Sequence, residues 1–482
     1  MVVHDMVFPE SFIFLMYLYF RYYYKSLMKN SYMKSSFLKK PLKLFPVSLT
    51  NKINRSKYGN LSLILTFLIG VTSLIVWFSQ RITYEIDPLI LIAKGSALVG
   101  ICFLSTTIFL SLRLHFMESI FGGMDKVYKA HHLIGQITML VIFLHPLFLV
   151  LNSLDNINLI LAYFIPGKYI PFTIGTISFL ILIVLLILTL IVNLPYKLWH
   201  LTHKFMGIAL ILATWHALIA GVDMNQYPVL RLWILIISLI GIFSYLYMLI
   251  LYQFIGPRYK ALVKEVNNKG NITEIKLMIK DKEFRFTPGQ FVFLKFINLE
   301  KTFEIFPFSI SCSNKDELLR ISAKRSGDFT SNLLPKINVG DEVYLYGPYG
   351  KFGEKSFYEK KDMLWIAGGI GVTPFISMLN EEYQNKVDFI WLCSDKNDAI
   401  YNKEIKGLIS GKDNIDYKLW ISGINGRMTS DKIINLFDLE NNIQDRLIFI
   451  CGPNQMMMEF ANKFIKAGVA PRNIIFEDFN LI

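Results

Sequence analysis

The first half of the chain contains six apolar runs, each long enough to cross a lipid bilayer. They lie near residues 61–79, 88–112, 131–152, 173–193, 203–221 and 230–255. A helix needs about 20 residues to cross the hydrocarbon core. Every backbone amide and carbonyl there must be hydrogen-bonded within the protein, which favours helices. The sequence therefore predicts a six-helix transmembrane bundle over residues 58–257.

Basic residues predict which way this bundle faces. Segments rich in lysine and arginine alternate along the chain with segments that are poor in them. The rich segments are 25–57, 113–130 and 193–204, and the poor ones are 152–172 and 221–229. Because basic loops favour the cytoplasmic side, we expect a multi-pass plasma-membrane protein with everything after residue 257 in the cytoplasm. Residues 1–57 form a basic N-terminal segment whose stretch 8–24 is a candidate interfacial helix.

The net charge of +13 is interpreted as contact with anionic lipid. The basic residues flank apolar runs and 53% of the residues are hydrophobic, so we expect no nucleic-acid partner. The 4 cysteines have no paired spacing, which argues against a disulfide framework and against a zinc or iron–sulfur site.

The second half of the chain changes character after residue 257. Short alternating runs such as EIKLMIK (274–280) and QFVFLKF (290–296) are separated by glycine and proline, which is typical of antiparallel strands. We predict a small antiparallel β-barrel over 258–355. From 356 to 482 the pattern becomes strand, glycine-rich turn and helix, which predicts an α/β nucleotide-binding domain.

All eight histidines precede residue 217, and six of them lie in or beside the third and fifth apolar runs. These are His131, His132, His145, His200, His203 and His216. An imidazole is costly to place in hydrocarbon, so a histidine inside a span is a functional candidate. Since histidine is a common axial ligand of haem iron, we interpret the group as haem ligands rather than as core side chains.

The third apolar run places two of these histidines on one face of the predicted helix. His131 and His145 are 14 residues apart. On an α-helix this places them within about 40° of one face and roughly 21 Å apart along the axis. His132 would point about 140° away from His145, so we expect it at the interface.

The fifth run does not space its histidines on one face. His203 and His216 are 13 residues apart and would diverge by about 140° on an ideal helix. Their use as ligands requires a π-bulge, a kink or unequal approach to the two haem planes. We predict that His131 pairs with His203 on the cytoplasmic side and His145 with His216 on the outer side. Two axial imidazoles leave no open position on iron, so each b-type haem would carry single electrons.

The motifs and their order resemble those of the ferric reductase / NADPH oxidase superfamily from about residue 60 to the end. The segments that carry the resemblance are AHHLIGQITMLVIFLHP (130–146), LWHLTHKFMGIALILATWHA (198–217), PGQF (288–291), FPFSIS (306–311), GDFT (327–330), GPYG (347–350), GGIGVTP (368–374), CGP (451–453) and FEDF (476–479). The resemblance implies a membrane flavocytochrome b with cytosolic domains like those of ferredoxin-NADP reductases.

The resemblance implies an FAD site on the barrel. Pro307, Phe308 and Ser309 match a Pro-Phe-Ser/Thr motif that lines the flavin. The aromatic ring can pack on the isoalloxazine, and the hydroxyl can bond near its reactive nitrogen. The family has a histidine, or in soluble relatives an arginine, where this chain has Phe306, so one polar contact to the cofactor is missing.

The GDFT turn resembles the family's FAD pyrophosphate site. Its residues are Gly327, Asp328, Phe329 and Thr330. Backbone amides and a hydroxyl in such a turn can cradle anions, and Lys324 adds positive charge nearby.

The resemblance also implies a dinucleotide site after the apolar strand 363–367. Gly369, Gly371, Thr373 and Pro374 belong to a G-x-G-x-x-P turn that opens a helix. Ser394 stands where NADPH-using members often carry arginine, which favours tolerance of NADH beside NADPH.

Three further residues belong to the nicotinamide side by resemblance. Cys451, Gly452 and Pro453 match the loop that holds the nicotinamide next to the flavin. Phe479 matches a near-terminal aromatic residue that stacks on the flavin until nicotinamide displaces it. Ser309, Cys451 and Phe479 are therefore the residues expected to touch the reacting rings.

The implied activity moves electrons from NADPH or NADH through FAD and two b-type haems to a small-molecule acceptor, either O2 or an Fe(III) chelate. Arg231 is a candidate residue for attracting that acceptor, and the sequence indicates no obligate protein partner. One alternative is a non-catalytic electron-conduit subunit that feeds a partner protein, against which the flavin and nicotinamide motifs argue. Another is a transporter or channel, against which the lack of inverted repeats and buried acidic pairs argues.

Overall fold

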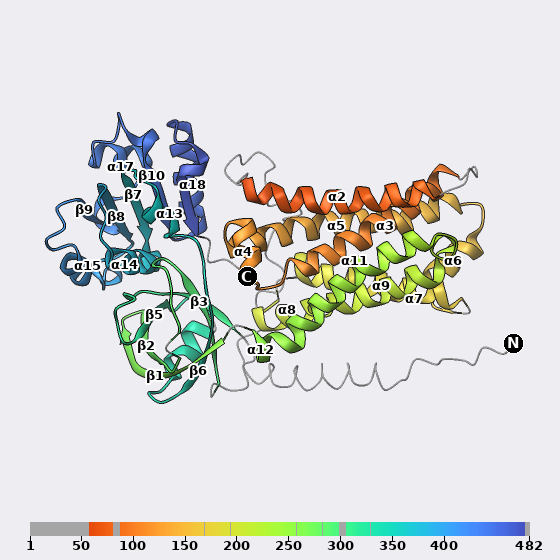
Figure 1. Ribbon diagram of the computed structural model, residues 1–482, viewed down its shortest axis with the longest axis horizontal. Coiled ribbons are helices and arrows are strands. Elements are labelled where there is room, and N and C mark those ends of the chain that lie inside the picture. The colour runs from red at the N-terminus through yellow and green to blue at the C-terminus, as the bar shows by residue number, and fades with distance from the viewer. Residues whose placement is uncertain are drawn as a thin grey trace.

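The structure is a computed structural model in which the chain forms a helical bundle and two sheet-containing domains. It describes residues 57–80, 87–167, 169–192, 194–256, 258–281, 283–297, 305–327 and 329–477. Figure 1 shows the two sheet domains together at one end of the bundle. The predicted basic segment 1–57 lies outside the described residues except for Lys57, where the first described helix, α2, begins.

Six helical segments in the described part of the chain are long and apolar enough to cross a membrane, which confirms the predicted bundle. They are α2 (Lys57–Ser79), α3 (Pro88–Phe109), α5 (Met124–Asn152), α7 (Ile170–Leu190), the consecutive α8 (Tyr196–His203) and α9 (Met206–Ala220), and α11 (Pro228–Leu246) with its continuation through a π turn (Tyr247–Leu251) and α12 (Tyr252–Ile255). The shorter helices α4 (His115–Phe121), α6 (Ile157–Phe164) and α10 (Val222–Gln226) lie between them.

Small residues let these helices approach closely. A Cβ atom on Gly241 of α11 would lie 2.8 Å from the Cα atom of Ser105 in α3, and one on Gly100 of α3 would lie 2.7 Å from the side chain of Ile142 in α5. In lipid, where no hydrophobic effect drives helices together, such contacts let van der Waals packing hold the bundle.

Two features of the bundle differ from a simple reading of the apolar runs. α5 begins at Met124, seven residues before the predicted run, because the polar turns 124–130 continue the helix beyond the apolar part. The fifth span is broken, since α8 ends at His203 and α9 begins at Met206. The break lies between the two histidines whose 13-residue spacing does not fit one face of an ideal helix.

The first sheet domain is a curled antiparallel sheet of six strands. The strands are β1 (Arg258–Lys269), β2 (Ile272–Ile279), β3 (Phe291–Phe296), β4 (Phe306–Ser309), β5 (Leu319–Lys324) and β6 (Glu342–Tyr349), in the order β4-β3-β6-β1-β2-β5. A bridge between Ile310 and Ile321 brings the two edge strands together. The barrel-like domain predicted from the sequence is confirmed.

The second sheet domain has five parallel strands between helices. They are β7 (Met363–Gly368), β8 (Val387–Cys393), β9 (Ile415–Ile421), β10 (Leu447–Cys451) and β11 (Ile474–Glu477), in the order β11-β10-β7-β8-β9. α14 (Thr373–Leu379) and α15 (Asn402–Leu408) cover one face, and α17 (Ser430–Leu436) and α18 (Asn454–Lys466) cover the other. The strand order reverses between β7 and β10, which is where open α/β sheets bind ligands.

An aromatic cluster joins the bundle to the barrel. The ring of Tyr252, at the end of the sixth span, stacks on that of Tyr346 in β6 at 5.2 Å between centroids. The hydroxyl of Tyr349 donates to the backbone carbonyl of Arg113 at 3.2 Å, and the Arg113 guanidinium lies 4.2 Å over the ring of Phe293. The four rings are at most 2% exposed. Burial of this aromatic surface fixes the barrel against one end of the bundle.

A buried ion pair in the second sheet domain yields a test of the fold. Arg446 Nη1 lies 2.5 Å from Asp388 Oδ2, and both side chains are at most 3% exposed. We expect Arg446→Met to lower the free energy of unfolding of this domain by about 3–5 kcal/mol, because the Asp388 charge stays buried without this partner. Denaturant-dependent proteolysis of the full chain measures this. The double variant with Asp388→Leu should recover most of the loss, and equal instability of both variants would contradict the account.

Candidate functional site

The structure brings the four predicted ligand histidines together as two pairs. The ring centroids of His131 and His203 are 6.1 Å apart, and those of His145 and His216 are 6.3 Å apart. His131 and His145 lie on α5, and His203 and His216 lie on α8 and α9, on either side of the break at residues 204–205. The pair His131–His203 is nearer the sheet domains and is called the near pair, and His145–His216 is called the far pair.

Hydrogen bonds fix the orientation and tautomer of three of these rings. The Nδ1 atoms of His131, His145 and His216 lie 2.7–2.8 Å from the backbone carbonyl oxygens of Thr107, Ala93 and Pro171, respectively. A carbonyl only accepts, so each Nδ1 carries the proton and each Nε2 keeps a lone pair available for a metal. The fourth ring, His203, stacks on Trp199 at 5.3 Å, and its buried Nδ1 has no hydrogen-bond partner among the described residues.

These pairs suit an iron porphyrin. A metal–imidazole bond is about 2 Å long, so two rings on opposite sides of one metal have centroids roughly 6 Å apart. No third His, Cys, Asp or Glu joins either pair among the described residues. A porphyrin would supply the remaining donors to a metal ion held between two imidazoles. A Cβ atom on Gly175 would lie 2.7 Å from the His216 ring, so this glycine makes room for the imidazole.

The remaining two histidines of the group are placed apart from this role. His132 is exposed and meets the His131 ring edge-on at 5.9 Å. His200 lies beside Trp199 on α8, with its ring centroid 6.5 Å from that of the indole.

The predicted flavin strand is β4 at the edge of the barrel. Phe308 and Ser309 are buried, and Pro307 pairs with Phe293 of β3. Phe306, the departure from the family pattern, stacks on Phe329 at 3.7 Å between centroids with 16° between the ring planes. An aromatic stack thus occupies the place where the family carries a polar side chain.

The predicted pyrophosphate turn is held by its own hydroxyl. Thr330 Oγ1 accepts from the backbone amides of Ser326 and Gly327, each at 3.1 Å, whereas Asp328 lies outside the described residues. Lys324 Nζ lies 3.3 Å from Asp398 in the second sheet domain. Lys324 therefore links the two sheet domains, a contact that the sequence did not suggest.

The predicted dinucleotide turns meet at the sheet's switch point. A Cβ atom on Gly371 would lie 2.8 Å from the Cα atom of Gly452 and would also overlap the carbonyl of Cys451. Gly369 and Gly452 have φ angles of 54° and 156°, the former in the left-handed region that favours glycine. The turns 368–374 and 451–453 thus form one backbone cradle, with the Thr373 hydroxyl donating to Ile370 O at 2.9 Å. The predicted aromatic residue Phe479 lies outside the described residues.

A cluster of buried carboxyl groups at the domain junction was not predicted. The backbone amide of Gly350, in the GPYG segment, donates to Glu118 Oε1 at 2.5 Å. Glu477 is 4% exposed, and a Cβ atom on Gly350 would lie 2.7 Å from its Oε1 atom. Burial, together with the nearby Asp125 and Glu118 carboxylates, raises the pKa of Glu477 well above its usual range. The only sequence signal was the pair of acidic residues in FEDF (476–479).

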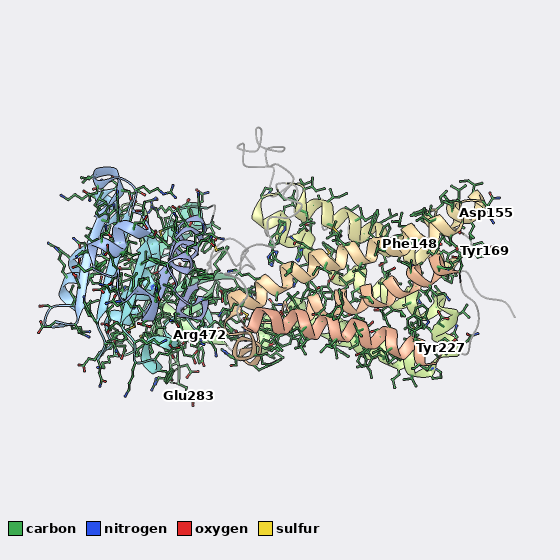
Figure 2. The ribbon with its side chains drawn as sticks, turned by 90° about the horizontal axis from the view of Figure 1, so that it is seen from above. Phe148, Asp155, Tyr169, Tyr227, Glu283 and Arg472 are labelled. Carbon is green, nitrogen blue, oxygen red and sulfur yellow. The ribbon has the colours of Figure 1, made fainter. Side chains whose placement is uncertain are left out.

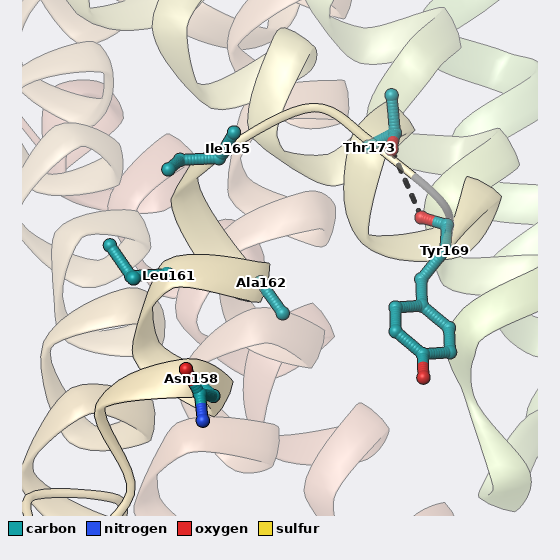
Figure 3. A pocket seen from close by; sticks show the side chains of 6 residues that line it. All are labelled: Asn158, Leu161, Ala162, Ile165, Tyr169 and Thr173. Atoms are coloured by element: carbon teal, nitrogen blue, oxygen red, sulfur yellow. Dashed lines mark hydrogen bonds between the residues drawn. The ribbon is translucent and has the colours of Figure 1, made fainter.

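The far end of the bundle has a pocket of about 260 Å³. Figure 2 shows Asp155, Tyr169 and Tyr227 at this end, opposite Glu283 and Arg472 in the sheet domains. The pocket lies between α6 and the start of α7 and is lined by Asn158, Leu161, Ala162, Ile165, Tyr169 and Thr173 (Figure 3). Thr173 donates to Tyr169 O at 3.0 Å and lies two residues after Pro171, whose carbonyl orients His216.

Comparison with known protein families matches three consecutive segments. Residues 96–214 match the ferric reductase like transmembrane component, 258–363 an FAD-binding domain and 365–463 an oxidoreductase NAD-binding domain. The chain is a member of the ferric reductase / NADPH oxidase superfamily. The three matches give it the domain set of an NAD(P)H-dependent oxidoreductase of this type.

The two relatives described next each match less than half of this superfamily member. Flavohemoprotein A of Dictyostelium discoideum is 26% identical over 40% of this chain and 52% of its own length. NADPH oxidase 1 of Mus musculus is 24% identical over 38% of this chain and 34% of its own length. The chain thus spans about half the length of the former and a third of the latter. A ferredoxin NADP+ reductase structure from Neisseria gonorrhoeae with bound FAD and NADP has a TM-score of 0.41 and 19% identity, covering 46% of this chain and 98% of that one.

The dinucleotide cradle of this superfamily member can be tested with one methyl group. Gly371→Ala should weaken NAD(P)H binding by about tenfold or more, because the new Cβ overlaps the Cys451–Gly452 backbone. Titration of flavin reduction with NAD(P)H measures this, and flavin content should stay unchanged. Gly407→Ala is the matched control, since no atom lies within 4 Å of the added Cβ. Equal affinity in both variants would contradict the cradle.

The buried Glu477 predicts a pH-dependent stability. Because its folded pKa is raised, the native state loses stability as pH rises from about 4.3, the usual pKa of glutamate, towards the folded pKa. Glu477→Gln removes this loss, so it should unfold at a higher temperature than the wild type at pH 8 but not near pH 4. Glu440→Gln, at an exposed position, should leave the unfolding temperature unchanged at both pH values. A lower unfolding temperature for Glu477→Gln at pH 8 would contradict the assignment.

Proposed function

We propose that this protein is a transmembrane NAD(P)H oxidoreductase that passes electrons through FAD and two b-type haems to O2 or an Fe(III) chelate across the membrane. The observation that carries the proposal is the presence of two imidazole pairs, each with one ring on α5. In each pair the distance between the ring centroids suits one metal ion held between the rings. The near pair lies at the end of the bundle where the barrel attaches, because Ala130 and Ile134, on either side of His131, share one buried cluster with Phe291 and Tyr346.

The domain limits and orientation belong to the same proposal. We assign 58–257 to the haem bundle, 258–355 to the FAD domain and 356–482 to the NAD(P) domain, with the last two in the cytoplasm and the bundle in the plasma membrane. The family matches at 96–214, 258–363 and 365–463 support these limits. The alternation of basic and non-basic loops supports the orientation.

The residues of the chain bind and orient the cofactors in this proposal. When bound, FAD converts a hydride into single electrons and the haem irons pass these on, chemistry that belongs to the cofactors. His131 and His203 would hold one iron, and His145 and His216 would hold the other. The carbonyl oxygens of Thr107 and Ala93 keep the two α5 rings in the Nδ1–H tautomer, which raises the basicity of the ligating nitrogen.

The flavin and nicotinamide roles follow the motifs. Pro307, Phe308 and Ser309 line the flavin, while Lys324 and the turn 327–330 lie on its phosphate side. Gly369, Gly371, Thr373 and Pro374 face the nucleotide phosphates of NADPH or NADH. Cys451, Gly452 and Pro453 would hold the nicotinamide, and the family resemblance assigns Phe479 to the flavin. The meeting of turns 368–374 and 451–453 in one cradle supports this assignment.

The proposal predicts a b-type haem spectrum in the wild type and a lower haem content in one histidine variant. Membranes that contain the protein should show a reduced b-type Soret and α band with dithionite, and NADPH with FAD should reproduce that spectrum. His145→Ala should remove about half of the haem, because the far pair loses one of its two ligands. Pyridine haemochrome spectra measure the content.

His132→Ala is the matched control, because the His132 ring is exposed and belongs to neither imidazole pair. It should keep the full haem content. An undiminished haem content in His145→Ala, or a haem that NADPH leaves oxidised, would contradict the proposal. Oxygen uptake and Fe(III)-chelate reduction, each with and without superoxide dismutase, then separate the two acceptors.

A further inference from the structure

An ion pair lies at the far end of the bundle, close to the far imidazole pair. Lys94 Nζ is 2.9 Å from Asp223 Oδ2, and the two side chains are 35% and 16% exposed. Lys94 is the only Asp, Glu, Lys or Arg in α3. A charge inside a membrane span is costly and marks a functional candidate.

The position of the pair follows from the neighbours of its two residues. Ala93, which precedes Lys94, accepts the hydrogen bond from His145 Nδ1. Asp223 lies in α10, which follows the helix that carries His216. Helical side chains lean towards the N-terminus of their helix, and α3 begins at the far end with Pro88. The stem of Lys94 therefore leads from the level of the far pair towards the far surface.

A purely structural link would not need charges here. Neutral side chains already join the helices of this bundle: Trp233 Nε1 donates to Ser73 Oγ at 2.9 Å, and the Ser178 hydroxyl donates to Ala209 O at 2.9 Å. Lys94 is about a third exposed and lies beside the far imidazole pair, and it carries a charge that these neutral contacts lack. It supplies a positive charge within reach of a molecule that approaches from the far side.

We propose that Lys94 is the electropositive contact for an anionic acceptor, a ferric polycarboxylate chelate, with Asp223 as its counter-ion when the acceptor is absent. This rests on the proposed function and selects between its two acceptors. O2 is neutral and gains little from a cation on approach, whereas a ferric chelate with excess carboxylates is attracted to one. A chelate carboxylate replaces Asp223 at Lys94 Nζ.

The electron balance of this step is simple. One NAD(P)H yields NAD(P)+, one proton and two electrons. Two Fe(III) chelates at the far end take one electron each and leave as Fe(II) chelates. No bond forms or breaks at the chelate and no proton is needed there, so Lys94 only has to hold the anion near the carrier.

The test compares acceptors of different charge. We expect Lys94→Gln to lower kcat/KM for anionic Fe(III)-EDTA by about tenfold, to leave the neutral Fe(III)–tris(maltolate) complex within about twofold and to raise the rate with cationic hexaammineruthenium(III). Lys94→Arg should keep the Fe(III)-EDTA rate, and Asp223→Asn should raise it. Added salt should slow Fe(III)-EDTA reduction less in Lys94→Gln than in the wild type.

A second readout does not depend on turnover. Equilibrium dialysis with redox-inert Ga(III)-EDTA should show weaker binding to Lys94→Gln than to the wild type. Arg231→Gln tests the rival cation at this end of the bundle, on α11, which the sequence had made a candidate for attracting the acceptor. If Arg231→Gln rather than Lys94→Gln loses the anionic acceptor, the proposal is overturned.

Two further results would also overturn the proposal. One is an equal fall for all three acceptors, or a loss of haem in Lys94→Gln, because either would indicate a purely structural link. The other is an unchanged rate with Fe(III)-EDTA. Failure of the proposed function itself would look different, since wild-type protein would then contain no haem that NAD(P)H reduces.

Discussion

The hydrogen bond from an imidazole Nδ1 to a backbone carbonyl is the interaction on which the rest of this molecule depends. His131 and His145 on α5 donate to carbonyls of α3, and His216 on α9 donates to a carbonyl at the start of α7. Each bond turns a flexible side chain into a fixed ring with its Nε2 lone pair directed at the opposite helix. The close packing of α3 on α5, with Gly100 against Ile142, brings the carbonyls within reach.

The second constraint is the attachment of the sheet domains at one end of the bundle that carries the two imidazole pairs. The Tyr349 hydroxyl donates a hydrogen bond to the carbonyl of Arg113, and the backbone amide of Gly350 donates one to the carboxylate of Glu118 in α4. Two adjacent residues of the barrel are thus hydrogen-bonded to the helical domain. The same segment lies against Glu477 at the end of the last described strand. A flavin on the barrel is thereby kept on the side of the near pair, whereas the far pair and Lys94 lie at the opposite end of the bundle.

Much of this could be read from the sequence because it is local. The six spans follow from runs of apolar residues, and the near and far pairs follow from the spacing of four histidines. The 13-residue interval between His203 and His216 indicated a π-bulge, a kink or unequal approach to the haem planes, but it could not choose among them or predict the two-residue break at Lys204 and Phe205. The junction was missed because Glu118 and Gly350 are 232 residues apart, and no periodicity reports a contact over such a distance. The Lys324–Asp398 link was missed for the same reason.

The central claim is that two pairs of imidazoles each hold one iron porphyrin. Low-temperature electron paramagnetic resonance of the oxidised, purified protein, with iron and porphyrin quantified in the same sample, tests it most directly. The account predicts two low-spin ferric signals per chain, both with g values typical of bis-imidazole coordination. A preparation that folds without porphyrin, or one whose iron is high-spin with an open axial position, would contradict it.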